Sequence, residues 1–95
     1  MNTESIREYC LSKKEVTESF PFNETTLVFK VFDKMFVLLD LETGSSVNLK
    51  CNPERAVSLR EQYPAITPGY HMNKKYWNTV VFDGSVPDDL IRGLI

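Results

Sequence analysis

Two apolar runs separated by two residues constrain the fold of this chain more than any other feature. Residues 27–32 (Leu-Val-Phe-Lys-Val-Phe) and 35–40 (Met-Phe-Val-Leu-Leu-Asp) are rich in the β-branched and aromatic side chains that favour strands. The gap between them, Asp33 and Lys34, has the length of a tight hairpin turn. The gap lacks the glycine that such turns favour, so a longer turn is the alternative. Either way, the runs predict an antiparallel sheet.

The residues before the hairpin favour a helix and then a loop. A helix is expected over residues 3–11, where Ser5 and Glu8 have the spacing of a capping box. Residues 12–26 lose this pattern, and Pro21 disfavours helical geometry in the residue before it. This segment is therefore predicted to be a loop with a short extended piece near Val16.

The residues after the hairpin alternate between strands and helices. Residues 46–50 predict a third strand, and Asn52 with Pro53 marks the start of a helix that Pro64 ends. Residues 70–72 and 76–82 predict two more strands around a tip at 73–75, and a last helix opens at residues 85–89. The order α-β-β-β-α-β-β-α predicts a two-layer α+β fold, an antiparallel five-stranded sheet with helices on one face.

The charges are unevenly distributed along a chain whose net charge is −2. Residues 1–26 carry three basic and five acidic groups, residues 27–80 seven and five, and residues 81–95 one and three. A net charge of −2 provides no overall attraction to nucleic acid or to an anionic membrane. The middle of the chain is nevertheless mildly basic.

The sequence gives little indication of a metal site, a cofactor site or a membrane segment. Cys10 and Cys51 have no CxxC spacing, and His71 is the only histidine, so a zinc site is not expected. The sequence lacks a signal-peptide pattern and an apolar run of about 20 residues. We therefore expect a cytoplasmic protein with no cofactor and no membrane partner.

The segment 68–80 (Pro-Gly-Tyr-His-Met-Asn-Lys-Lys-Tyr-Trp-Asn-Thr-Val) is the candidate binding element. In one interpretation Lys74 and Lys75 meet phosphates, Trp77 or Tyr76 packs on a sugar or base, and Asn73 offers a hydrogen-bonding edge. In the other, Trp77 covers the sheet, the lysines lie in a solvated turn and His71 packs locally. Both interpretations are open at this point.

Several segments in order along the chain resemble the MmcQ/YjbR family of small bacterial proteins. They are residues 20–22 (Phe-Pro-Phe), 29–31 with 34–36 (Phe-Lys-Val and Lys-Met-Phe), 48–51 with 53–54 (Asn-Leu-Lys-Cys and Pro-Glu), 68–80, and 86–89 (Val-Pro-Asp-Asp). The resemblance covers roughly residues 3–95, which we expect to form a single domain. Family members usually continue through a longer final helix with a Ser-Tyr pair, so the domain is expected to be truncated in its C-terminal helix.

The resemblance implies a domain of the CyaY-like or secretion-chaperone-like type. Such domains carry two projecting hairpins called a double wing, and on that basis the family is commonly labelled DNA-binding. This label is itself inferred from the fold, which does not determine function.

Lysines on the expected strands could extend the candidate surface. Lys30, Lys34 and Lys50 could join Lys74 and Lys75 in one basic face. The alternative is a polar strand face on which lysines discourage edge-to-edge aggregation.

Catalysis and iron binding are not expected. A nucleophile motif and a phosphate-binding glycine loop are both missing from the sequence. The CyaY-like type suggests iron binding on an acidic first helix, but the acidic set is sparse and interrupted by lysines at 13 and 14. Its members are Glu4, Glu8, Glu15 and Glu18.

Two hypotheses for a monomeric, non-enzymatic binding module follow. The first is DNA binding through a basic and aromatic wing. The second is a protein-interaction or chaperone-like module with no nucleic-acid role. The residues expected to carry the first are Lys34, Lys50, His71, Asn73, Lys74, Lys75 and Trp77.

Overall fold

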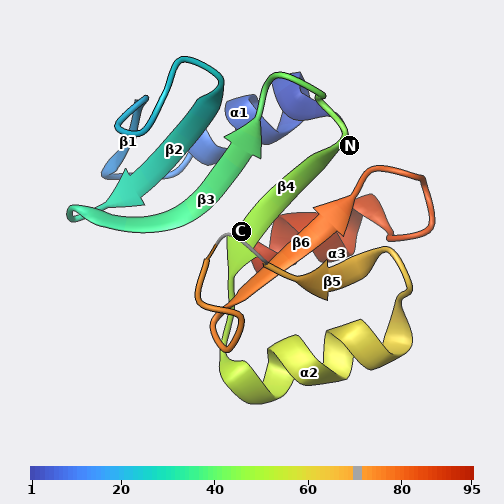
Figure 1. Cartoon of the computed structure of the whole chain (residues 1–95). Helices are drawn as coiled ribbons and strands as arrows, with labels where there is room; N and C mark the ends of the chain where they lie inside the picture. Colours follow the sequence, from blue (N-terminus) through green and yellow to red (C-terminus); the bar gives the residue numbers. More distant parts are fainter. Residues whose placement is uncertain (70–71) are drawn as a thin grey trace.

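The computed structural model describes residues 1–69 and 72–95, and within these residues the chain forms three helices and six strands (Figure 1). The fold is α+β, as the sequence predicts. The elements follow in the order α1 (Thr3–Leu11), β1 (Val16–Ser19), β2 (Thr26–Val31), β3 (Lys34–Asp40), β4 (Ser46–Lys50), α2 (Pro53–Gln62), β5 (Ile66–Pro68), β6 (Trp77–Val81) and α3 (Asp88–Leu94).

The described strands form one antiparallel sheet in the order β1-β2-β3-β4-β6-β5, so the prediction of five strands is wrong. The additional strand is β1, which the sequence suggested only as an extended piece near Val16. Three of its four residues are polar, and their strand geometry comes from pairing with β2, from Val16 opposite Val31 to Ser19 opposite Val28. A short polar edge strand has a weak local signal because its partner supplies most of its stabilisation.

The strand before β6 also differs from the prediction. It is β5, at Ile66–Pro68, rather than residues 70–72. Of the predicted strand, Tyr70 and His71 lie outside the described residues, and Met72 lies in a bend. Ile66 is buried and pairs with Val80, which fixes β5 at the edge of the sheet.

All three helices contribute to one core on one face of the sheet. Side chains from the helices pack with alternate residues of the central strands, because removing apolar surface from water is the main force in folding. Figure 1 shows α2 beside β5 and β6. The buried members of this core are Ile6, Cys10, Leu27, Phe29, Val37, Leu39, Val47, Leu49, Leu59, Ala65, Ile66, Val80, Val86 and Ile91.

The tight turn between β2 and β3 is displaced by one residue from the expected position. Val31 pairs with Lys34, so the two turn residues are Phe32 and Asp33 and β3 begins at Lys34. Both turn residues have positive φ, 49° for Phe32 and 65° for Asp33. The hairpin itself is confirmed, and its turn has the left-handed backbone of the tightest hairpin turns.

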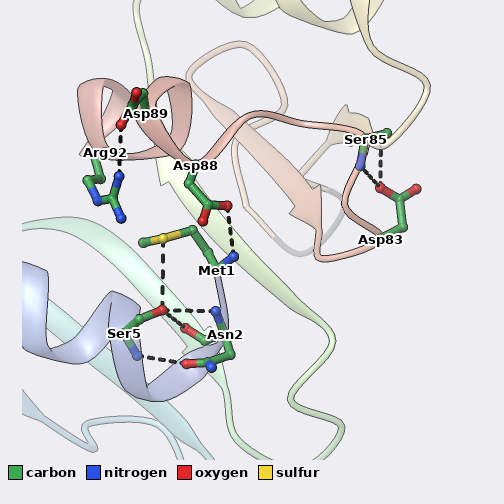
Figure 2. Close-up of polar contacts among 8 residues, drawn as sticks. All are labelled: Met1, Asn2, Ser5, Asp83, Ser85, Asp88, Asp89 and Arg92. Carbon is green, nitrogen blue, oxygen red and sulfur yellow. Dashed lines mark hydrogen bonds and ion pairs between the residues drawn. The ribbon is translucent and has the colours of Figure 1, made fainter.

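The first helix begins as predicted, but a different pair of residues caps it. The Asn2 side chain accepts a hydrogen bond from the Ser5 backbone N–H at 2.8 Å, and Ser5 Oγ accepts from the Asn2 N–H at 2.9 Å (Figure 2). Asn2 is therefore the cap residue and Ser5 its partner inside the helix, whereas the prediction had Ser5 as the cap residue and Glu8 as its partner. The terminal ammonium of Met1 forms an ion pair with Asp88 at 2.9 Å, which joins the start of α1 to α3.

The Arg7–Glu18 ion pair between α1 and β1 should make stability depend on pH. The hydrogen bond from Arg7 lowers the pKa of Glu18 in the folded protein below its ordinary value of 4.5. The pair therefore stabilises the folded protein fully at pH values above 4.5. This stabilisation is lost as the pH falls through the lowered pKa of the folded state. Glu18→Gln should unfold at less urea than the unmodified protein at about pH 7, and the difference should shrink towards about pH 3. Glu24→Gln is the control. A difference in urea stability between Glu18→Gln and the unmodified protein that stayed the same at both pH values would contradict the prediction.

The two cysteines should differ in reactivity. Cys10 is fully buried, which raises the pKa of its thiol to about 12, whereas Cys51 is half-buried; neither is in a disulfide. Because the thiolate is the reactive form, Cys51→Ser should resist iodoacetamide until urea unfolds it, and Cys10→Ser should be alkylated in the folded state. Mass spectrometry measures both, and rapid labelling of Cys10 in the folded protein would contradict this.

Candidate nucleic-acid interface

The register of the sheet places several turns at one end. Val31 pairs with Lys34 and Lys50 pairs with Trp77, so β2 ends, β3 begins, β4 ends and β6 begins there. Because Val16 pairs with Val31, β1 also begins at this end. Turns that are far apart in sequence therefore lie at the same end of the sheet.

All seven lysines lie at or beside this end, which we call the lysine end. Lys30, Lys34 and Lys50 come from the strands, and four more come from the segments before β1 and β6. Lys34 and Lys50 are exposed, and Lys30 is half-buried. The full set is Lys13, Lys14, Lys30, Lys34, Lys50, Lys74 and Lys75.

Cations outnumber carboxylates at the lysine end. The start of α2 adds Arg55, giving eight cationic side chains against the three carboxylates Glu15, Asp33 and Glu54. Ion pairs are formed by the terminal ammonium, Arg7 and Arg92, and within residues 1–69 and 72–95 none involves Lys30, Lys34 or Lys50. This set of eight cations includes the five lysines of the predicted basic face, and the basic face itself stays a prediction.

Carboxylates gather at the opposite end of the sheet. The Ser85 N–H and Oγ–H donate to Asp83 at 2.9 and 2.6 Å, and these bonds lower the pKa of Asp83 (Figure 2). The terminal ammonium lowers the pKa of Asp88. With the lysines at one end and these carboxylates at the other, the two signs of charge are separated along the sheet. The acidic residues at or near this end are Glu24, Asp40, Glu42, Asp83 and Asp88.

The loop before β6 is built around Asn73 and Gly69. The Asn73 side chain accepts from the Lys75 N–H at 2.9 Å, and its carbonyl accepts from the backbone of Tyr76 and Trp77. A Cβ on Gly69 would lie only 3.0 Å from the Trp77 Cβ, so glycine permits this close approach. Asn73 thus shapes the turn. The predicted role of His71 lies outside the described residues.

Trp77 is a buried residue of the helix-free face. It is 5% exposed and clusters with Val28 and Leu38, with Met35 and Met72 packed against them. Of the two interpretations of this residue, the structure favours the one in which it covers the sheet. A ring with so little exposed surface cannot serve as a stacking platform in this conformation.

Among the described residues, two other aromatic side chains are exposed at the lysine end. Phe32 is 76% exposed at the tip of the β2–β3 hairpin, and Tyr76 is 39% exposed, with Lys75 Nζ 5.8 Å from its ring centroid. The sequence interpretation named Tyr76 as an alternative to Trp77 for stacking, but it missed Phe32. Strand alternation alone could not single out Phe32, because Val28, at the same phase of the strand, is apolar and buried.

The helix-free face also carries a hollow of about 660 Å³. Its lining consists mainly of hydroxyl and amide side chains, with a few apolar groups and the carboxylates Asp40 and Glu42. No lysine or arginine lines it among the described residues, so it does not suit a polyanion. The hydroxyl and amide groups are Asn23, Thr25, Thr26, Ser46, Asn48, Thr67 and Thr79.

Asn78 is a buried polar residue on the helix side of β6. Its Nδ2 donates to the Ala56 carbonyl of α2 at 3.2 Å, while its Oδ1 is buried without a protein partner among the described residues. The bond joins α2 to the sheet, so Asn78 has a structural role.

Metal and membrane features were sought among residues 1–69 and 72–95. This part of the chain holds no cluster of three or more His, Cys, Asp or Glu side chains that could bind a metal ion. It likewise holds no helix that is long and apolar enough to span a membrane.

Comparisons with known proteins relate this chain to one family of proteins. A family model described as YjbR matches residues 11–95. The uncharacterized protein YjbR of Escherichia coli K12 is 34% identical over 96 residues, covering 100% of this chain and 81% of that protein. The uncharacterized protein YbdF of Escherichia coli O157:H7 is 36% identical over 93 residues, covering 97% of this chain and 76% of that protein.

Solved structures share the fold. Protein DR2400 of Deinococcus radiodurans has a TM-score of 0.88 and 42% identity, with 96% of this chain and 70% of that chain covered. A Pseudomonas syringae protein has a TM-score of 0.80 and 29% identity, with 99% and 92% covered. The six-stranded sheet with three helices is thus shared with experimental structures of similar sequence.

The burial of Trp77 should be visible in fluorescence, because it is the only tryptophan. Its emission should be blue-shifted and poorly quenched by acrylamide in the folded protein, and freely quenched in urea. Trp77→Ala should lower the free energy of unfolding by about 3–5 kcal/mol through the cavity it leaves. Efficient quenching of the folded protein would show that the ring is accessible.

Proposed function

The chain belongs to the YjbR family, and from that premise and the charge distribution we propose that it is a monomeric, non-enzymatic DNA-binding module whose binding surface is the lysine end. The E. coli relatives are themselves uncharacterised, so the proposal depends on the chemistry of this chain.

The observation that carries the proposal is the placement of all seven lysines at one end of the sheet. Lysine side chains that contact phosphates release the counterions condensed on DNA, and this release favours binding whatever the base sequence. The acidic opposite end would be repelled by the same phosphates, so the polarity also orients the protein on DNA.

The turn geometry supports a wing-like arrangement as part of this proposal. The β2–β3 hairpin and the connection between β5 and β6 both turn at the lysine end. Lysines beside these two connections could contact successive phosphates of a strand. This supports the double wing and the CyaY-like relationship inferred from the family resemblance.

A protein partner is the second candidate function, and the hollow on the helix-free face favours it. Phe22 is 60% exposed at the edge of this hollow, and Leu38 and Met72 also line it. A partner segment with apolar and hydrogen-bonding groups would suit such a lining. Binding there would need neither the lysine end nor a nucleic acid.

The DNA-binding proposal can be tested by fluorescence anisotropy. Labelled single-stranded and duplex DNA are titrated at about 50 and about 200 mM salt, and binding should weaken with salt. Lys34→Gln/Lys50→Gln should bind more weakly, with a salt slope lower by about 0.7–0.9 for each lost phosphate contact.

The matched control is Arg7→Gln/Arg92→Gln, which removes the same charge away from the lysine end. It should retain nearly full affinity. If neither form of DNA is bound at low salt, or if both double variants lose affinity equally, the lysine end is not a DNA-binding surface.

A further inference from the structure

The tip of the β2–β3 hairpin has an unfavourable residue for its backbone. Phe32 and Asp33 form a two-residue turn with φ of 49° and 65°, where Asn, Asp and Gly are favoured. Asp33 suits this conformation. A bulky aromatic residue at positive φ is a rare outlier that costs free energy. Local backbone preference therefore does not explain Phe32.

Packing does not explain Phe32 either. Its side chain is 76% exposed, more than any other large apolar side chain in the described part of the chain. Single exposed apolar residues are common, but this one combines exposure with backbone strain. Strained residues tend to persist where function needs them, so Phe32 is a candidate contact residue.

The surroundings of Phe32 suit a nucleic acid. Lys30 and Lys34 lie on either side of the turn, and the register shift at Phe29/Lys30 is the kind of irregularity that bends a hairpin and increases its twist. Lysines behind an aromatic apex can contact phosphates while the ring contacts a base. Tyr76, which is also exposed at the lysine end, offers a second stacking surface.

We propose that Phe32 stacks on unpaired bases and that the lysine end prefers single-stranded DNA to duplex DNA. This inference rests on the proposed function and adds the kind of strand and the residue that selects it. Base faces are accessible in a single strand, whereas in a duplex they are stacked on their neighbours. Asp33, beside the ring, would disfavour insertion of the tip into an anionic membrane.

The test uses an abasic strand to separate stacking from phosphate contact. Labelled oligothymidylate of about 12 nucleotides, an abasic strand of the same length and a duplex are titrated by fluorescence anisotropy. Phe32→Asn should weaken binding to oligothymidylate at least about fivefold and leave binding to the abasic strand unchanged. Because Asn tolerates positive φ, this variant should fold with equal or greater thermal stability.

Phe20→Asn is the matched control, because Phe20 is 49% exposed just after β1, at the opposite end of the sheet. It should bind all three ligands like the unmodified protein. Equal binding of oligothymidylate by Phe32→Asn and the unmodified protein would overturn the stacking role. If Lys34→Gln/Lys50→Gln still weakened binding, the proposed function would stand.

Two other results would also overturn the inference. One is tighter binding of the duplex than of the single strand. The other is Phe32-dependent binding to vesicles of anionic phospholipid without binding to any oligonucleotide, which would reject the proposed function as well.

Discussion

The antiparallel register of the sheet is the constraint on which the rest of the structure depends. Because neighbouring strands run in opposite directions, alternate turns lie at opposite ends of the sheet. The turns and strand ends at one end carry the lysines, whereas Glu24, Asp40, Glu42, Asp83 and Asp88 lie at or near the other end. A chain with a net charge of −2 thereby acquires a strongly cationic edge. Net charge alone is a poor guide to the partners of such a protein, because the sheet separates the two signs in space.

The two faces of the sheet have different roles. One face is covered by the helices and holds the main core, to which Asn78 adds a hydrogen bond with α2. The other face has a small cluster around Trp77 and a hollow lined by hydroxyl and amide groups. The lysine end and the hollow differ in chemistry, since lysines favour a polyanion and the hollow favours a neutral or cationic group. They are separate candidate surfaces, and the first carries the proposed function.

Local sequence signals predicted elements well and side-chain environments poorly. The Asn52 cap with Pro53 marked the start of α2 correctly, and the apolar runs predicted the β2–β3 hairpin. Strand β1 was missed as a full member of the sheet because its four residues carry little apolar pattern without their partner. Strand alternation already favoured packing on the sheet for Trp77, but stacking stayed open from the sequence, and the burial of the ring in the structure favours packing.

The amino-acid sequence by itself determined the class of fold, the helix starts and the hairpin, because caps, prolines and apolar periodicity act over a few neighbouring residues. Only the tertiary structure decided that seven lysines share one end, that Trp77 is buried and that Phe32 is exposed under backbone strain. These features arise from pairings between distant segments, such as Lys50 with Trp77. Such pairings depend on the packing of the whole sheet, and a pattern of a few neighbouring residues cannot predict them.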